Sequence, residues 1–303
     1  MAVSFPRLWR WWVAGAVKAW PLFNSRSKDT PISLTWRPNF STPTGNILID
    51  SGVPKRIHQL EFIGSSEQLP HLLGAFDSVL PSNLSLMRLH IIPYGDREQH
   101  GPLSSFLTSS FPKLSQLDLW NLLPDSSSPI FTTSSLTSLK LHFPYQKRNH
   151  YTLSQFSQIH QHHPNLQELD LNHGAIPLPG PSSDSAPFTL PRLVGLRLHG
   201  VEAAISGFID LIGMSSPLHD VVVHFIRGPG SPVPALVGTV KKILDGYYEC
   251  WGLNYTRKVN NFTISYSLDG DHLVFNAQSR SSNPRSNLEL QINGIYEQVG
   301  EVW

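Results

Sequence analysis

The feature that most constrains the fold of this chain is a short apolar pattern, LxxLxL, that recurs along most of its length. Its clearest copy is Leu166, Leu169 and Leu171 in the segment HPNLQELDLNH, where polar residues fill every gap. Apolar and polar residues alternate after the second leucine, as they do in a strand with one buried face. Six further copies follow the same frame: Ile57-Leu60-Phe62, Leu86-Leu89-Ile91, Leu114-Leu117-Leu119, Leu136-Leu139-Leu141, Leu193-Leu196-Leu198 and Leu218-Val221-Val223.

The spacing of these copies predicts how the strands are arranged. Their middle residues are 22 to 30 residues apart, and this pattern resembles leucine-rich repeats, whose period is roughly 20–29 residues. One copy cannot bury its apolar edge alone, so a continuous core requires stacked copies. We therefore expect an α/β fold: an irregular leucine-rich-repeat-like solenoid with a parallel inner sheet.

The segments between the predicted strands favour helices. Apolar residues have helical spacing over residues 69–80, 103–107, 153–159, 205–212 and 236–247. Each repeat therefore reads as a strand, a loop and a helix, and stacking would place the helices on the convex side of the solenoid.

The two ends of the chain differ from the repeats. Residues 8–23 are apolar but interrupted by Arg10 and Lys18, which favours an amphipathic helix, and they are too short for a membrane span. Apolar residues alternate on both sides of Asp269-Gly270, which predicts a β-hairpin. We therefore expect three domains: a helix and linker over 1–45, the solenoid over 46–249, and C-terminal strands that cap it over 250–303.

Composition narrows the classes of partner and compartment. Lys and Arg total 23 against 22 Asp and Glu, so the formal net charge is +1. This balance predicts neither a nucleic-acid footprint nor a basic membrane patch, so we expect no nucleic acid and no membrane as partners. Cys250 is the only cysteine, which rules out an intrachain disulfide framework and favours a cytoplasmic or nuclear location.

The segment before the repeats carries three short motifs: Pro6-x-Leu8-Trp9, Arg26-Ser27 and Pro31-Ile32-Ser33-Leu34. Their order resembles the junction in a large group of fungal F-box proteins. There the F-box ends in a Pro-x-Leu-Trp turn, a helix and an Arg-Ser segment follow, and Pro-Leu-Ser-Leu begins the repeats. The resemblance covers roughly residues 5–225. It implies the substrate-recognition region of an F-box protein, which belongs to a cullin–RING ubiquitin ligase.

Two features depart from that family's pattern. An F-box begins with a Leu-Pro-x-Glu pattern, and the sequence as given starts after nearly all of this element. A Skp-type adaptor is therefore an expected partner only if a complete F-box exists upstream. Leucine-rich repeats also carry Asn or Cys three residues after the last strand leucine. Here those positions hold Ser65, Tyr94, Leu122, Pro144, Gly174, Val201 and Ile226, so a regular asparagine ladder is not expected.

Motifs for catalysis or metal binding are weak. The sequence has no phosphate loop, Gly-x-Ser-x-Gly elbow, His-Glu-x-x-His or dinucleotide glycine pattern, so we expect no enzyme and no cofactor. The best metal candidates are His160, His162, His163 and His173, because imidazoles ligate zinc. However, His162 and His163 end a predicted helix, where the dipole favours cationic side chains. We therefore expect no metal site.

The most informative candidate site is the concave face of the inner sheet. Residues that flank the middle leucine of each copy, and the residue after its third apolar position, point to this face. We expect Trp120 to lie exposed next to Ile92 and to anchor a peptide, with charged neighbours that set specificity. An ordinary solvated sheet face is the alternative. The candidate partner-binding residues are Arg88, His90, Ile92, Asp118, Trp120, Lys140, His142, Asp170, Arg197 and His199.

Three functions stay open at this point. The leading hypothesis is a non-enzymatic module that binds a protein ligand on the concave face and resembles an F-box substrate receptor. The second is a free-standing leucine-rich-repeat scaffold without a ubiquitin-ligase role. The third is a secreted repeat protein, in which the N-terminal segment would be a signal and some sequons would carry glycans. Those sequons begin at Asn39, Asn83, Asn254 and Asn261.

Overall fold

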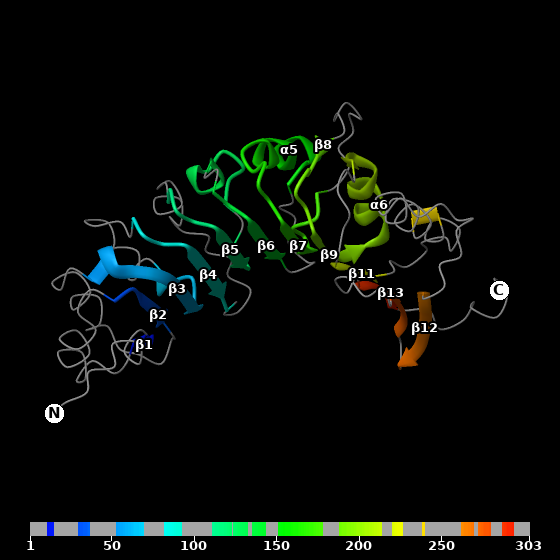
Figure 1. The fold of residues 1–303 in the computed structure, drawn as a ribbon, viewed down its shortest axis with the longest axis horizontal. Coiled ribbons are helices and arrows are strands. Elements are labelled where there is room, and N and C mark those ends of the chain that lie inside the picture. The colour runs from blue at the N-terminus through cyan, green and yellow to red at the C-terminus, as the bar shows by residue number, and fades with distance from the viewer. Residues whose placement is uncertain are drawn as a thin grey trace. The chain divides into compact units, whose positions relative to one another are not determined.

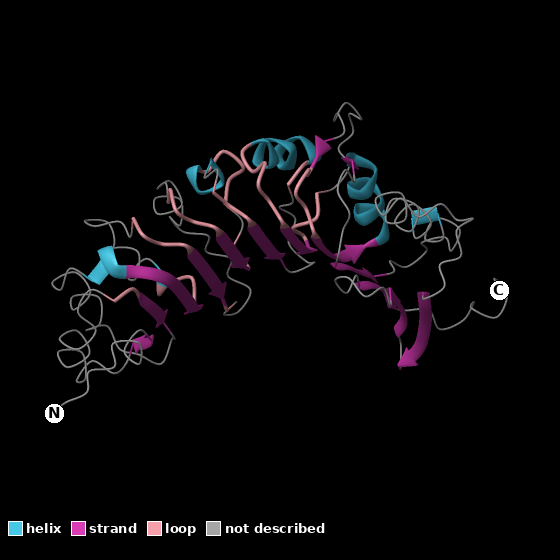
Figure 2. Cartoon of the chain, in the orientation of Figure 1, coloured by secondary structure: helices cyan, strands magenta, loops and turns pink. Residues whose placement is uncertain are grey.

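In the computed structural model of the chain, eight parallel strands form a single sheet and helices are few, so the fold class is α/β. Figure 2 shows how strongly strands predominate over helices. The described residues are 11–14, 30–36, 53–69, 82–92, 111–122, 124–132, 135–143, 151–177, 188–213, 220–226, 238–239, 262–269, 272–279 and 287–293.

The strands of the parallel sheet follow one another in chain order. Such an order is expected where each strand is joined to the next by a similar connection, as in stacked repeats. The eight strands are β2 (Ile32–Trp36), β3 (Ile57–Gly64), β4 (Leu86–Ile91), β5 (Gln116–Trp120), β6 (Ser138–Phe143), β7 (Glu168–His173), β9 (Gly195–Val201) and β11 (Asp220–Ile226).

The connections contain the few helices and one small second sheet. Two predicted helices are confirmed, α5 (Leu153–Gln161) and α6 (Glu202–Leu211), and the others lie outside the described residues except for Leu69 and residues 238–239. Among the described residues, no helix has the length and apolar character needed to cross a membrane. The remaining connecting elements are the 3-10 helices η3 (Val53–Arg56) and η4 (Pro129–Thr132) and the paired strands β8 (Phe188–Thr189) and β10 (Ile212–Gly213).

The chain divides into two compact units, residues 1–139 and 140–303. In the first unit, strand register places the buried apolar residues in continuous rows. One row is Leu34, Leu60, Met87 and Leu117, and the next is Trp36, Phe62, Leu89 and Leu119. In this stack, the apolar residues of each strand are buried against those of the neighbouring strand, which a single copy could not achieve alone.

The register corrects one of the predicted repeats. The expected frame Leu86-Leu89-Ile91 is wrong, because Met87 pairs with Leu60 and Leu117 and the true copy is Leu84-Met87-Leu89. Leu86 instead lies between Gln59 and Gln116 on the opposite side of the sheet. Side chains alternate along a strand, so the segment LSLMRLHI offers an apolar residue to both frames and the pattern alone does not separate them.

The second unit repeats this arrangement and adds a helical layer. Leu169, Leu196 and Val221 form one buried row, and Leu171, Leu198 and Val223 form the next. Figure 1 shows α5 and α6 on the same side of the strands of this unit. Between them, the rings of Phe156, Phe188 and Phe208 pack with centroid distances of 5.2 to 6.3 Å. The leucine face of this unit is therefore closed by helices.

The N-terminal segment differs from expectation. Trp11–Ala14 forms a strand, β1, which pairs in parallel with β2, so the helix expected over 8–23 is wrong at these four residues. β2 lies in the segment that was expected as a linker, and it pairs with β3 as a member of the same sheet. The rest of the N-terminal segment before residue 30 lies outside the described residues.

The C-terminal strands agree with the predicted hairpin. β12 (Phe262–Asp269) and β13 (His272–Ser279) pair antiparallel. β13 also pairs with β14 (Asn287–Asn293), and β14 runs parallel to β11. The hairpin therefore extends the sheet of the second unit beyond β11.

A ladder of hydroxyl groups clamps the start of successive strands in the first unit. The residue after the first leucine of each copy has a side chain that donates to the backbone of the preceding copy. Ser85 donates to the carbonyl of His58 at 3.1 Å, Ser115 to that of Ser85 at 3.0 Å, and Thr137 to that of Ser115 at 3.0 Å. Backbone N–H groups of the same residues bond to the same carbonyls at 2.8 Å. We call this series the hydroxyl ladder.

Removing one hydroxyl of this ladder should weaken the first unit measurably. Ser115→Ala should lower the free energy of unfolding by about 0.5–1.5 kcal/mol, the usual net value of one intramolecular hydrogen bond. Urea denaturation followed by circular dichroism gives the value. Ser127→Ala is a suitable control, because Ser127 is exposed and bonds locally to Asp125. Equal stability of the Ser115 variant and the wild type would show that the hydroxyl ladder is not stabilising.

Candidate functional site

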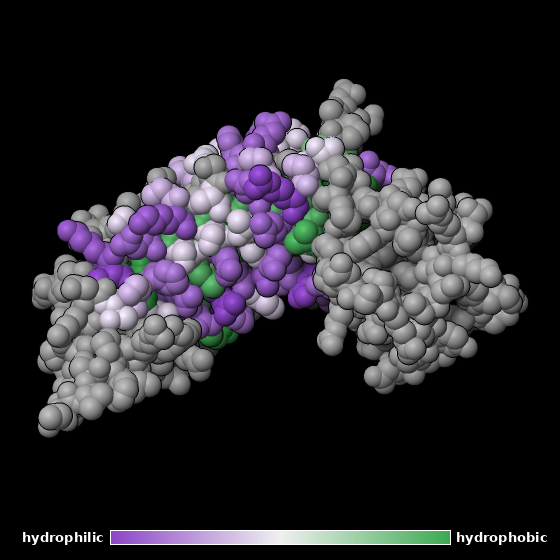
Figure 3. Space-filling view, in the orientation of Figure 1, coloured by the Kyte–Doolittle hydropathy of each residue, from purple (hydrophilic) through white to green (hydrophobic). Residues whose placement is uncertain are grey.

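The candidate site is the side of the parallel sheet opposite the buried leucine rows, called the open face below. Its residues alternate with the buried ones along every strand, and most are partly exposed. In the view of Figure 3, hydrophilic residues cover much of the described surface, with small apolar patches between them. In the first unit the open face consists of Ser33, Thr35, Gln59, Glu61, Ile63, Leu86, Arg88, His90, Gln116, Asp118 and Trp120.

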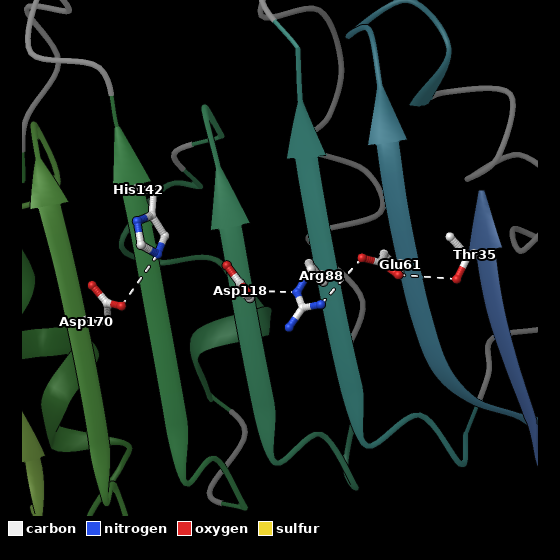
Figure 4. Close-up of polar contacts among 6 residues, drawn as sticks. All are labelled: Thr35, Glu61, Arg88, Asp118, His142 and Asp170. Atoms are coloured by element: carbon white, nitrogen blue, oxygen red, sulfur yellow. Dashed lines mark hydrogen bonds and ion pairs between the residues drawn. The ribbon is translucent and has the colours of Figure 1, made fainter. Parts of the chain in front are cut away.

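One row of the open face in the first unit is a chain of polar contacts across four strands. Thr35 donates to Glu61 at 3.2 Å. Arg88 lies between two carboxylates: its Nη1 is 3.4 Å from Glu61 Oε1 and its Nε is 2.9 Å from Asp118 Oδ2. Figure 4 shows these side chains projecting from neighbouring strands toward one another. Parallel register alone puts them in line, because Thr35, Glu61, Arg88 and Asp118 are successive partners.

The electrostatics of this row leave a small excess of negative charge. Burial opposes the charge on Arg88, but its hydrogen bonds and attraction to Asp118 and Glu61 outweigh burial, so the pKa of Arg88 is raised. One guanidinium therefore faces two carboxylates. Asp118 is only 14% exposed, and its Oδ1 is buried without a hydrogen-bond partner among the described residues. Such an atom is energetically costly, so this row retains capacity for a further donor.

Trp120 lies at the end of the open face in the first unit. Its side chain is 36% exposed, and its ring lies 5.1 Å from that of His90 with a tilt of 32°. Register pairs Trp120 with His90, whereas Ile92, the expected neighbour, follows the end of β4. Ile91 points into the core, so His90 beside it lies on the open face and is the residue paired with Trp120.

Asn121 fixes the chain immediately after Trp120. It has a φ of 57°, in the left-handed region that Asn tolerates better than most residues. Its Nδ2 donates to the carbonyl of Ile91 at 2.7 Å. In the leucine-rich-repeat pattern such an asparagine is expected one position later, where this chain has Leu122. This contact ties the end of β5 to the end of β4 and so restricts the position of Trp120.

In the second unit, the open face forms an open hollow of about 400 Å³. Side chains from β6, β7, β9 and β11 surround it, including three histidines, two aspartates and one arginine. The register explains the grouping, because Asn172, His199 and His224 are partners on successive strands. The hollow is lined by His142, Asp170, Asn172, Arg197, Leu198, His199, Asp220, Val222 and His224.

The ionisable groups of the hollow form two close pairs. Arg197 Nη2 is 2.8 Å from Asp220 Oδ2, and this hydrogen bond raises the pKa of Arg197. Attraction to Asp220, Asp170 and Glu168 acts in the same direction, against the opposing effect of burial. His142 Nε2 lies 3.8 Å from Asp170 Oδ2, as Figure 4 shows. One arginine is thus surrounded by more carboxylate charge than it can neutralise.

The histidines do not form a metal site in the described part of the chain. There, no group of three His, Cys, Asp or Glu side chains has an arrangement that could hold a metal ion. The rings of His199 and His224 pack edge to face, with centroids 5.3 Å apart. Of the earlier metal candidates, His163 is fully buried and His162 is exposed, while the side chains of His160 and His173 lie outside what is described.

The ten predicted residues fall into separate groups. Arg88, His90, Asp118 and Trp120 lie together in the first unit, and Ile92 follows the end of β4. In the second unit, His142, Asp170, Arg197 and His199 line the hollow, and Lys140 is half-buried on β6. The predicted set omitted Glu61, Asn172, Asp220 and His224, although all four occupy open-face positions.

Comparison of the chain with protein-family models, with curated proteins and with solved structures finds no match in any of the three. The residues of the open face are therefore the basis for a functional proposal.

Proposed function

We propose that this chain is a non-enzymatic protein-interaction module with an irregular leucine-rich-repeat-like solenoid, and that it binds a protein ligand on the open face. In this proposal it acts as the substrate-recognition region of an F-box-like protein, as the motifs around Pro6 and Pro31 imply. The observation that carries the binding role is Trp120. It is a large aromatic side chain that is partly exposed two residues after Asp118, beside an ordered row of charges.

The solenoid part of the proposal is supported by repetition at three levels. Apolar rows recur in register within each unit. The hydroxyl ladder makes the same contact at successive copies of the first unit. Helices lie in the connections that follow β6 and β9. In such a fold, the strands β12 to β14 would serve as the C-terminal cap, because terminal repeats need a different outer edge.

The binding part is supported by the rigidity of the open face. The ion pairs around Arg88 and the bond from Asn121 to Ile91 hold polar and aromatic groups in place before a ligand arrives. Preorganised groups lose little conformational entropy on binding. Aromatic and arginine side chains are also the most frequent hot spots of protein interfaces. The open face therefore has the properties of a recognition surface.

Trp120→Ala tests this role. We expect the variant to lose capture of its protein ligands, because an aromatic hot spot contributes about 2 kcal/mol or more to binding. Its melting temperature should fall by only a few degrees, because the lost ring contact with His90 is worth about 0.5–1.5 kcal/mol. Capture from a cell extract, followed by quantitative mass spectrometry, measures the first effect and calorimetry the second.

Val194→Ala is the matched control for this experiment. Val194 is 37% exposed, close to the exposure of Trp120, but it precedes β9 and lies outside the open face. Ligands kept by Val194→Ala and lost by Trp120→Ala would support the proposal. If Trp120→Ala melts many degrees lower while its folded fraction still captures the same ligands, Trp120 is a packing residue and the anchor role is rejected.

A further inference from the structure

The hollow of the second unit carries more negative than positive charge. Arg197 contributes one positive charge to the lining, and Asp170 and Asp220 contribute two negative charges. With neutral histidines the lining therefore sums to −1. Glu168, which is exposed next to the hollow, also attracts Arg197. Lys140 lies on the same face of β6, two residues before His142. Counting both Lys140 and Glu168 leaves the net charge at −1.

The hollow also contains a hydrogen-bond acceptor that is not satisfied. Oδ1 of Asn172 is buried and has no hydrogen-bond partner among the described residues. Buried acceptors nearly always find a donor, and a donor that enters the hollow is one way to satisfy this atom. Asn172 is one of the residues that line the hollow. The excess negative charge favours a cation, the unsatisfied acceptor favours a hydrogen-bond donor, and one positively charged donor meets both requirements.

We propose that the hollow binds a cationic side chain, lysine or arginine, of the protein ligand. The cation lies between Asp170 and Asn172, where the carboxylate supplies charge and the amide oxygen accepts a hydrogen bond. This inference rests on the proposed function and names the chemistry of the partner: a segment with a basic residue at the position that meets β7 and β9.

The geometry disfavours other occupants. An anionic group in the hollow would meet Asp170 and Asp220, and the guanidinium of Arg197 is already bound to Asp220 at 2.8 Å. The described residues supply no three-ligand metal arrangement. The first unit shows the same combination, since one arginine faces Glu61 and Asp118 and an oxygen of Asp118 lacks a donor in the described residues. A basic ligand is therefore complementary to the open face of both units.

A displayed library of random peptides, selected on the full chain, provides the probe. We expect the selected peptides to be enriched in lysine or arginine. Fluorescence anisotropy then compares binding of one selected peptide, and of its Lys→Gln or Arg→Gln derivative, to the wild type and to Asp170→Asn. Each single change should weaken binding about tenfold, and both together should be little worse than one, because they remove the same contact.

Two further variants keep the test decisive. Asp125→Asn removes the same charge from an exposed turn and should leave affinity unchanged. Asn172→Asp adds a carboxylate to the hollow with almost no change of shape, so it should strengthen binding of the basic peptide even if Asp170→Asn folds poorly. Circular dichroism checks the folding of each variant.

The outcomes separate this inference from the proposed function. Basic peptides that bind Asp170→Asn and Asp125→Asn equally would place the cation elsewhere and overturn the inference. Selected peptides without a cation that still require Trp120 would overturn it as well, while leaving the proposed function intact. Enrichment of no peptide at all would count against both.

Discussion

Replacement of Leu169 with alanine is expected to lower the free energy of unfolding by about 2–5 kcal/mol, the range found for leucines in protein cores. The residue is only 1% exposed and stacks on Leu196 in the row that continues to Val221. Neighbouring strands hold the row in register, so it cannot collapse freely into the space that alanine leaves. Urea denaturation, monitored by circular dichroism, measures the loss.

The control for this prediction is again Val194→Ala. It also removes apolar volume from a residue beside a strand, but from a side chain that is 37% exposed. Its effect should stay within about 0.5 kcal/mol, as for most surface substitutions. A loss at Leu169 no larger than that at Val194 would mean that the leucine rows are not the core of the second unit.

Phe208→Ala should be at least as damaging, with an expected loss of about 3–5 kcal/mol. The ring is fully buried on α6 and packs edge to face on Phe156 of α5, with centroids 5.2 Å apart and an interplanar angle of 82°. A second contact, to Phe188 of β8, has a centroid distance of 6.3 Å. The substitution therefore removes the common element between three connecting segments. Differential scanning calorimetry should show a markedly lower melting temperature.

Two variants define how this result is interpreted. Phe208→Leu keeps most of the apolar volume and should recover a large part of the stability. Gln158→Ala, on the exposed side of α5, should have almost no effect. Equal destabilisation by Phe208→Leu and Phe208→Ala would indicate that the aromatic geometry, and not the buried volume, holds the helices.

The parallel strands could be predicted from the sequence because they depend on a local pattern. Leucines that alternate with polar residues mark one buried face, and seven copies at similar spacing indicate that these faces stack. The register of one copy could not be predicted in this way. Around Met87, apolar residues occupy both alternating sets, so the choice depends on the partner strands and on the hydroxyl of Ser85.

The candidate site was predictable as a face but not as a set of contacts. Alternation places Asp118 and Trp120 on the same side of β5, and the structure agrees. The register partner of Trp120 depended on the misplaced copy at Met87, and that partner is His90. The hollow brings together residues from four strands, including Asp220 and His224, and a single-strand pattern holds no information about such a volume.

The hydroxyl ladder has a consequence for how this chain can vary. Each rung is made at the first residues of a copy, before the strand begins, so the alignment of open-face residues is set upstream of the strand and not by the connection that follows it. Connections of unequal length are then compatible with matched rows such as Glu61, Arg88 and Asp118. New loops could be inserted after a strand without shifting the residues that face a partner. The recognition surface and the connecting segments are thereby free to diversify independently.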